Sequence, residues 1–220
     1  MHSTNSLVPN IITEFDEINN ELKEINLSID KLTTTALNAL LLKLNCTNYN
    51  TRGGAGFIQW DAMVRNIREL CCGEYWEKYE NNGVEGIIAK DKKIKLIPSS
   101  GNAATANINQ IPSNKNPKGF KTMKLINKSS QKRLFQIYPD HIEDFESEVY
   151  VLLYYNNSKE LKLELSIPSY IDKKGYIRAW KKRILLPPIK LNEVQIKAIT
   201  TQTLPKIEDE IDIPIRRKPQ

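Results

Sequence analysis

The side chains best suited to chemistry in this sequence are lysines and arginines gathered in two stretches. Residues 90–133 contain 11 basic side chains and one acid, Asp91, and residues 172–183 contain six basic side chains and one acid, Asp172. If the two stretches share one face, they create a positive potential that attracts phosphate groups. Lys outnumbers Arg 24 to 8, which favours sequence-independent phosphate contacts over bidentate contacts with bases. The alternative is a solvated, lysine-rich surface.

The first stretch contains a spacing that fits a phosphate backbone. Four lysines, from Lys121 to Lys132, recur at intervals of 3, 4 and 4 residues, so on a helix they line one face. The second stretch contains tyrosines and Trp180, whose rings either stack on bases or fill the core of a sheet. The expected nucleic-acid contacts are Lys121, Lys124, Lys128, Lys132, Arg133, Lys173, Lys174, Lys181, Lys182 and Arg183.

A pair of short motifs has the residue types of a metal-dependent nuclease. Asp140 follows a proline, and Glu160-Leu161-Lys162 comes after a further 19 residues, which gives the form PD…ExK. Two carboxylates could hold Mg²⁺, and a lysine could orient the attacking water or stabilise negative charge. Glu160 and Lys162 would point to one face of a strand. An ordinary amphipathic strand shows the same alternation, so nuclease activity is the alternative, with Asp140, Glu160 and Lys162 as its catalytic residues.

Other constellations predict less chemistry. Gly53-Gly54-Ala55-Gly56 matches GxxG ahead of an expected helix, where it either approaches a phosphate or forms a flexible joint. The three cysteines contain no CxxC motif, and the two histidines lie far from them in sequence, so no metal site is expected. No cofactor is expected apart from Mg²⁺ under the nuclease alternative. Reduced thiols indicate a cytoplasmic protein.

The start of the chain carries a heptad pattern. Apolar residues recur at alternating intervals of 4 and 3 from Ile11 to Ala39, which predicts one long amphipathic helix over residues 10–45. Its seam packs either within its own domain or in a coiled coil with a second copy or another subunit. The expected assembly residues are Ile11, Phe15, Ile18, Leu22, Ile25, Ile29 and Leu32.

The remaining patterns place helices before strands. Helical spacing predicts a second helix over 59–81, ended by Asn81-Asn82-Gly83. A hairpin is expected over 87–97, a flexible basic loop over 98–119, and further strands over 149–155, 161–165, 176–180 and 183–186. The predicted organisation is a helical region (1–82), a mainly antiparallel β region (83–190) and a loose tail (191–220), which makes the fold α+β.

Composition limits the possible functions. The 220 residues carry a net charge of +6 and are 40% hydrophobic, which excludes collagen-like and disulfide-scaffold proteins. No apolar run reaches the length of a membrane span. The abundance of Lys, Ile and Asn resembles a bacterial or mobile-element genome rich in A/T. The expected function is a non-catalytic, nucleic-acid-associated accessory subunit that assembles with itself or another protein through its N-terminal helix. The alternatives are the nuclease and a protein-interaction adaptor without nucleic-acid contact.

Overall fold

The computed structural model describes residues 8–131 and 147–191. Within these residues the chain forms four helices and an eight-stranded mixed sheet, so the α+β prediction is confirmed. The helices are α1 (Phe15–Glu24), α2 (Ile29–Leu44), α3 (Gly54–Cys71) and α4 (Phe120–Gln131). The strands are β1 (Asn10–Ile12), β2 (Trp76–Asn81), β3 (Val84–Ala89), β4 (Ile94–Ser100), β5 (Glu148–Asn156), β6 (Glu160–Ile171), β7 (Ile177–Leu185) and β8 (Ile189–Lys190).

One sheet joins the two ends of the described chain. Its strand order is β1-β7-β6-β5-β4-β3-β2, and β8 pairs with the start of β6. Two of the described pairings, β1 with β7 and β4 with β5, are parallel, and the others are antiparallel. The strands expected near 87–97, 149–155 and 161–165 are present, whereas the two expected over 176–180 and 183–186 form one continuous strand, β7. Because β1 and β2 both come from the region expected to be helical, the helical and β regions share one core.

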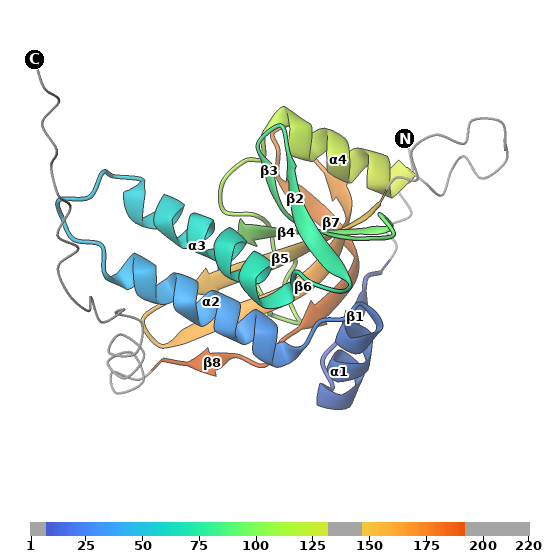
Figure 1. The fold of residues 1–220 in the computed structure, drawn as a ribbon, viewed down its shortest axis with the longest axis horizontal. Helices are drawn as coiled ribbons and strands as arrows, with labels where there is room; N and C mark the ends of the chain where they lie inside the picture. Colours follow the sequence, from blue (N-terminus) through green and yellow to red (C-terminus); the bar gives the residue numbers. More distant parts are fainter. Residues whose placement is uncertain (1–7, 132–146, 192–220) are drawn as a thin grey trace, which may run out of the picture.

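Helices cover both faces of the sheet. The larger apolar cluster joins α1, α2 and α3 to one face, through residues such as Leu22, Met63 and Leu163. The smaller cluster joins Ile126 of α4 to the opposite face, through Val151 and Trp180. Figure 1 shows α2 and α3 side by side, with α4 at the top of the view; α2 contacts β6, and α3 contacts β2, β3 and β4. The core is therefore two apolar layers, one on each side of the sheet.

The long heptad helix is not confirmed. Residues 10–12 form a strand, and the helix that follows is divided at residues 25–28. Asn26 adopts a left-handed backbone conformation (φ 53°), which ends α1. Ser28 then caps α2, because its side-chain oxygen accepts a hydrogen bond from the Lys31 amide (3.2 Å). The 4-3 spacing persists across the break because both helices bury one face in the same core.

The predicted assembly seam belongs mostly to the interior of the chain. Ile18, Leu22, Ile25 and Leu32 are all buried in the larger core cluster. Ile11 and Ile29 are partly buried, and only Phe15 in this set is largely exposed (60%). Most of the seam therefore packs within the chain itself, which favours the intramolecular alternative.

The second helix ends earlier than predicted. α3 ends at Cys71, and residues 76–81 form β2, which pairs with β3 as a hairpin. Asn82 and Gly83 both have positive φ (52° and 78°), the conformation of a two-residue hairpin turn of type I′. The sequence Asn-Gly, interpreted above as a helix end, is therefore a strand-to-strand turn. The predicted tail lies, apart from Leu191, outside the described residues.

Candidate anion-binding pocket

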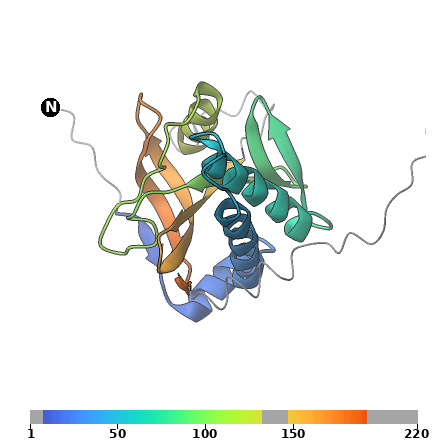
Figure 2. The ribbon, with the colours of Figure 1, turned by 90° about the vertical axis from the view of Figure 1, so that its left-hand side faces the viewer.

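A pocket of about 400 Å³ opens where the parallel strands β4 and β5 end. Its lining includes the end of α2, the start of α3 and part of the segment of residues 101–119. Figure 2 shows how these helices and this segment run relative to the sheet. Ligand sites often lie beyond the carboxyl ends of parallel strands, because the chain diverges there into different layers. The lining residues are Lys43, Gly53, Gly56, Phe57, Gln59, Trp60, Ser100, Gly101, Lys115, Asn116, Pro117, Lys118, Tyr154, Tyr155 and Asn156.

Three lysines and no acid contribute to this lining. The Lys43 Nζ donates a hydrogen bond to the Asn156 Oδ1 (3.0 Å), and Gln59 donates to the same oxygen (3.4 Å). Among the described residues, no carboxylate forms an ion pair with Lys43, Lys115 or Lys118. The pocket therefore has a positive charge that no ion pair within residues 8–131 and 147–191 neutralises.

Burial and mutual repulsion change the acidity of these lysines. Burial lowers the pKa of Lys118 from its ordinary value of 10.5 to about 8. Burial also lowers the pKa of Lys43, and the nearby charge of Lys115 lowers it further. Both effects disfavour the charged form. An anion in the pocket would reverse them, because its negative charge stabilises the ammonium groups.

The first turn of α3 adds amide donors to the same pocket. Its N-cap is Gly53, which has no side chain to accept a hydrogen bond, and no acidic residue lies in the first turn. Within the described residues, the amides of Ala55 and Gly56 donate to no acceptor. Free amides and the positive end of the helix dipole both favour an anion. The GxxG sequence therefore begins a helix, and its two outer glycines, Gly53 and Gly56, line the pocket.

Aromatic rings line the pocket beside these charges. Phe57 and Trp60 lie on successive turns of α3, with their ring centroids 5.8 Å apart and their planes tilted by 43°. Phe57 is 63% exposed and Trp60 is partly exposed. Tyr154 is buried in the core and Tyr155 is partly buried. Phe57 and Trp60 therefore offer accessible aromatic surface, whereas Tyr154 forms a wall.

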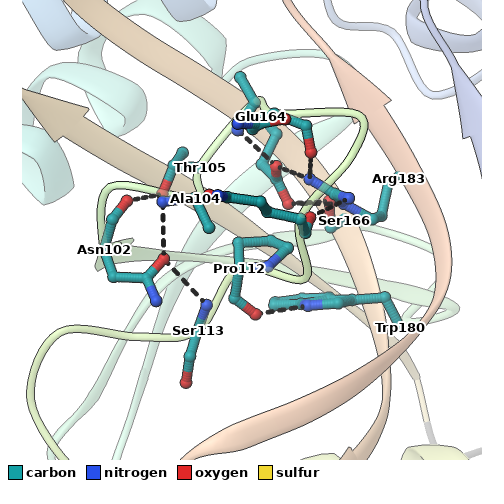
Figure 3. A network of polar contacts seen from close by, with 12 residues as sticks. Asn102, Ala104, Thr105, Pro112, Ser113, Glu164, Ser166, Trp180 and Arg183 are labelled. Carbon is teal, nitrogen blue, oxygen red and sulfur yellow. Dashed lines mark hydrogen bonds and ion pairs between the residues drawn. The ribbon is translucent and has the colours of Figure 1, made fainter.

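A buried ion pair fixes the segment that carries two of the pocket lysines. Glu164 on β6 and Arg183 on β7 are at most 1% exposed, and their closest atoms are 2.7 Å apart (Figure 3). The carboxylate also accepts hydrogen bonds from the Ala106 amide (2.7 Å) and the Ser166 hydroxyl (2.9 Å). The guanidinium donates to the carbonyls of Asn107 and Gln110. Hydrogen bonds to both side chains of the ion pair therefore hold the middle of the 101–119 segment against β6 and β7.

Three further anchors hold the second half of the segment. The Trp180 indole donates to the Pro112 carbonyl (2.9 Å). The Asn114 side chain donates to the Gly175 carbonyl (2.8 Å) and accepts from the Ile177 amide (2.8 Å). The Lys118 amide donates to the same glycine carbonyl (2.9 Å). Gly175 has φ +83°, and a Cβ there would lie 2.5 Å from the Lys118 carbonyl oxygen, so this approach requires glycine.

The prediction of a flexible loop over 98–119 is corrected accordingly. Residues 98–100 belong to β4, and Gly101 forms an isolated β-bridge with Asn114. The segment contains few apolar side chains, which is why its composition predicts disorder. Its order comes instead from buried polar partners on β6 and β7, which composition does not reveal.

The predicted lysine row lies on α4. Lys121, Lys124 and Lys128 are exposed and line one shallow groove of about 220 Å³ with Tyr79. Helical spacing does place these three on one face, as expected. Lys132 and Arg133 lie outside the described residues.

The second predicted group is divided between surface and interior. Lys173 and Lys174 are exposed in the turn between β6 and β7. Lys181 forms an ion pair with Glu148 and Lys182 forms one with Glu21. Because neighbouring residues of a strand point to opposite faces, these two lysines do not act together. The prediction for Arg183 is corrected: its side chain is buried against Glu164 and cannot reach a nucleic acid.

The nuclease motif is described only in part. Glu160 and Lys162 do lie on one face of β6, with the ammonium 3.0 Å from the carboxylate. Asp140 lies outside the described residues. Within residues 8–131 and 147–191, no group of three or more His, Cys, Asp or Glu side chains could hold a metal ion. Within the described residues, the partner of Glu160 is therefore the basic side chain of Lys162.

Sequence patterns did not single out Lys43, Phe57 or Trp60, and they placed Lys115 and Lys118 only within a charged stretch. The available signal was local: two aromatic residues follow a glycine-rich helix start. What joins them to the lysines is the packing of α2, α3 and the 101–119 segment at one end of the sheet. That juxtaposition is tertiary, so spacing along the chain does not reveal it.

No protein-family model, curated protein or solved structure matches this chain. In the described residues, no helix combines the length and the apolar character needed to cross a bilayer. The fold and the site together define an α+β protein with a basic, aromatic-lined pocket at the end of its sheet.

Proposed function

We propose that this protein is a non-catalytic nucleic-acid-binding protein that binds single strands through the pocket between α3 and the 101–119 segment. The observation that supports this proposal is the convergence of Lys43, Lys115 and Lys118 beside Phe57 and Trp60, with no acidic residue in the lining. Proteins that bind single strands combine a positive groove for the backbone with aromatic rings on which bases stack. A duplex keeps its bases stacked on one another, so exposed rings favour the single strand.

Lysines outside the pocket extend the same surface. The Lys118 amide bonds to the Gly175 carbonyl, so the turn that carries Lys173 and Lys174 adjoins the pocket. The chain then enters α4, where Lys121 is exposed in the first turn. A strand leaving the pocket therefore meets further positive charge. Sequence-independent contacts with phosphates are what such scattered lysines support.

The test is fluorescence anisotropy with one labelled sequence of about 12 nucleotides, as single-stranded DNA, single-stranded RNA and duplex DNA, at several salt concentrations. We expect the single strands to bind more tightly than the duplex. The double variant Lys115→Met, Lys118→Met should lower the affinity at least tenfold and reduce the log–log salt slope by about 1.4, since each lost contact removes about 0.7. The matched control is Lys23→Met, Lys90→Met, which removes two exposed lysines elsewhere.

The same experiment separates the alternatives. Incubation with Mg²⁺ or Mn²⁺ should leave the strands intact, whereas degradation that Glu160→Ala abolishes would favour the nuclease. Absence of binding to every strand at low salt would contradict the proposal and favour an adaptor role. Equal losses in the pocket variant and the control would show that net charge alone attracts the strand.

A further inference from the structure

The pocket is of a size for one nucleotide. Its volume of about 400 Å³ falls in the range of sites for small ligands, whereas single-strand sites commonly cover about 4–16 nucleotides. If the proposed function is correct, one residue of the strand enters the pocket and the rest lies outside. The remaining question is which nucleotide of the strand enters.

Along α3, the groups that line the pocket change from amide donors at the start of the helix to an aromatic ring one turn later. Gly56 lies in the first turn, where its amide and that of Ala55 have no acceptor among the described residues, and Trp60 lies one turn further along. Four residues of helix advance by about 6 Å, which is comparable to the separation of a phosphate and the base of the same nucleotide. A phosphate at the helix start therefore leaves its base beside Trp60 and Phe57.

The charge of the pocket indicates whether it would hold a terminal phosphate or an internal phosphate of the strand. An internal phosphodiester carries one negative charge, whereas a phosphate monoester carries about −1.5 to −2 at pH 7. In the described part of the chain, the three lysines have no carboxylate partner and the amides of Ala55 and Gly56 have no acceptor. Together they form a site with more positive charge than a diester neutralises. On these grounds we infer that the pocket holds the terminal nucleotide of a strand, through its phosphate monoester.

This inference rests on the proposed function and predicts a preference that general strand binding does not. Oligonucleotides of one sequence should bind at least tenfold more tightly with a phosphate at one end than with hydroxyls at both ends. A 5′-phosphate and a 3′-phosphate are measured separately. Adenosine monophosphate should compete with the phosphorylated strand, whereas adenosine should not, and inorganic phosphate should compete only weakly because it lacks a base.

Tryptophan fluorescence provides a readout inside the pocket. Of the three tryptophans, Trp76 and Trp180 are buried in the core and Trp60 is partly exposed in the pocket. Binding of adenosine monophosphate should therefore quench mainly the emission of Trp60, and Trp60→Phe should remove that change. Phe57→Ala should weaken binding, whereas Tyr170→Ala, which removes another exposed aromatic ring, should not.

The outcomes separate the two proposals. If strands with and without a terminal phosphate bind equally and the binding depends on salt, the proposed function stands and the inference is overturned. If no strand binds, the proposed function fails, and quenching by adenosine monophosphate would then indicate a site for free nucleotides in place of strand ends. In Lys118→Met, a loss of affinity for phosphate-ended strands that is clearly larger than the loss for hydroxyl-ended strands is the result that supports the inference most directly.

Discussion

Lys118, which we propose as a contact for the ligand, reduces the stability of the protein that carries it. Its side chain is charged at neutral pH although burial lowers its pKa to about 8. Among the described residues it has no carboxylate partner, so its burial opposes folding. Residues with such displaced pKa values concentrate at functional sites. The lysine is therefore better explained by a ligand than by the fold.

We expect Lys118→Met to raise the free energy of unfolding at pH 7 by about 1–3 kcal/mol, since one pKa unit corresponds to about 1.4 kcal/mol. In the unfolded chain the lysine keeps its proton up to about pH 10.5, and in the folded chain it loses it near pH 8. Between these pH values the unfolded state binds more protons than the folded state, so the stability of the wild type rises with pH. The difference in free energy of unfolding between the variant and the wild type therefore becomes smaller. Urea denaturation at pH 7 and pH 10 measures it. A variant that is less stable at both pH values would contradict this account.

The same lysine sets the pH dependence of binding. Lys43, Lys115 and Tyr154 face it across the pocket, and an anion favours the charged form of the lysines. The affinity for adenosine monophosphate should therefore be constant up to about pH 8 and fall above it, as Lys118 of the free protein loses its proton. It should also fall below about pH 6, where the phosphate gains a proton. Isothermal titration over pH 5–10 tests this, and an affinity that rises above pH 8 would exclude Lys118 as a contact.

At the scale of elements, the sequence predicted strands better than it predicted helices. Alternation and β-branched runs located β5, β6 and β7, because they reflect burial on a pleated surface. The 4-3 pattern joined α1 to α2 because Asn26, which breaks the helix, occupies an outward-facing position that the apolar pattern ignores. Asn82-Gly83 was ambiguous in sequence, since the same residues end helices and turn hairpins.

The 101–119 segment gives a prediction about its buried anchor. Glu164→Gln leaves the Arg183 guanidinium buried without a countercharge, which typically costs about 3–5 kcal/mol. Trypsin should then cleave the variant after Lys115 or Lys118, where the wild type is resistant. The control is Glu160→Gln on the same strand, whose partly exposed pair with Lys162 should contribute at most about 1 kcal/mol. Cleavage of the wild type there as fast as of Glu164→Gln would contradict the proposed anchoring.

For the molecule as a whole, we expect the heptad residues to contribute to the stability of the fold in place of assembly. Leu22 is fully buried in the cluster that joins α1–α3 to the sheet. Leu22→Ala should therefore lower the free energy of unfolding by about 2–5 kcal/mol, with circular dichroism and tryptophan fluorescence changing together in denaturant. The matched control, Phe15→Ala, lies in the same helix with an exposed side chain and should change stability little. A loss of oligomers at unchanged stability would restore the coiled-coil interpretation.

The composition predicted a basic α+β protein, and the charge distribution predicted an anionic ligand, but neither placed the pocket. Lys43 lies on α2, Trp60 lies on α3, and Lys118 lies before α4. Only the packing of these segments in the folded protein brings them together. Sequence reasoning finds sites whose residues are close in the chain. A pocket assembled from three separate segments depends on packing that the sequence pattern does not encode locally.

The pairing of β1 with β7 also has a consequence for how the chain reaches its native state. Asn10 to Ile12, near the start, lie beside Lys182 to Ile184 near the other end of the described chain. Contacts between such distant residues slow folding, because a long loop must close before they form. During synthesis, β1 emerges long before its partner strand. The sheet is therefore completed only after β7 has left the ribosome. Until then, the edge of β6 that later pairs with β7 stays open to other chains.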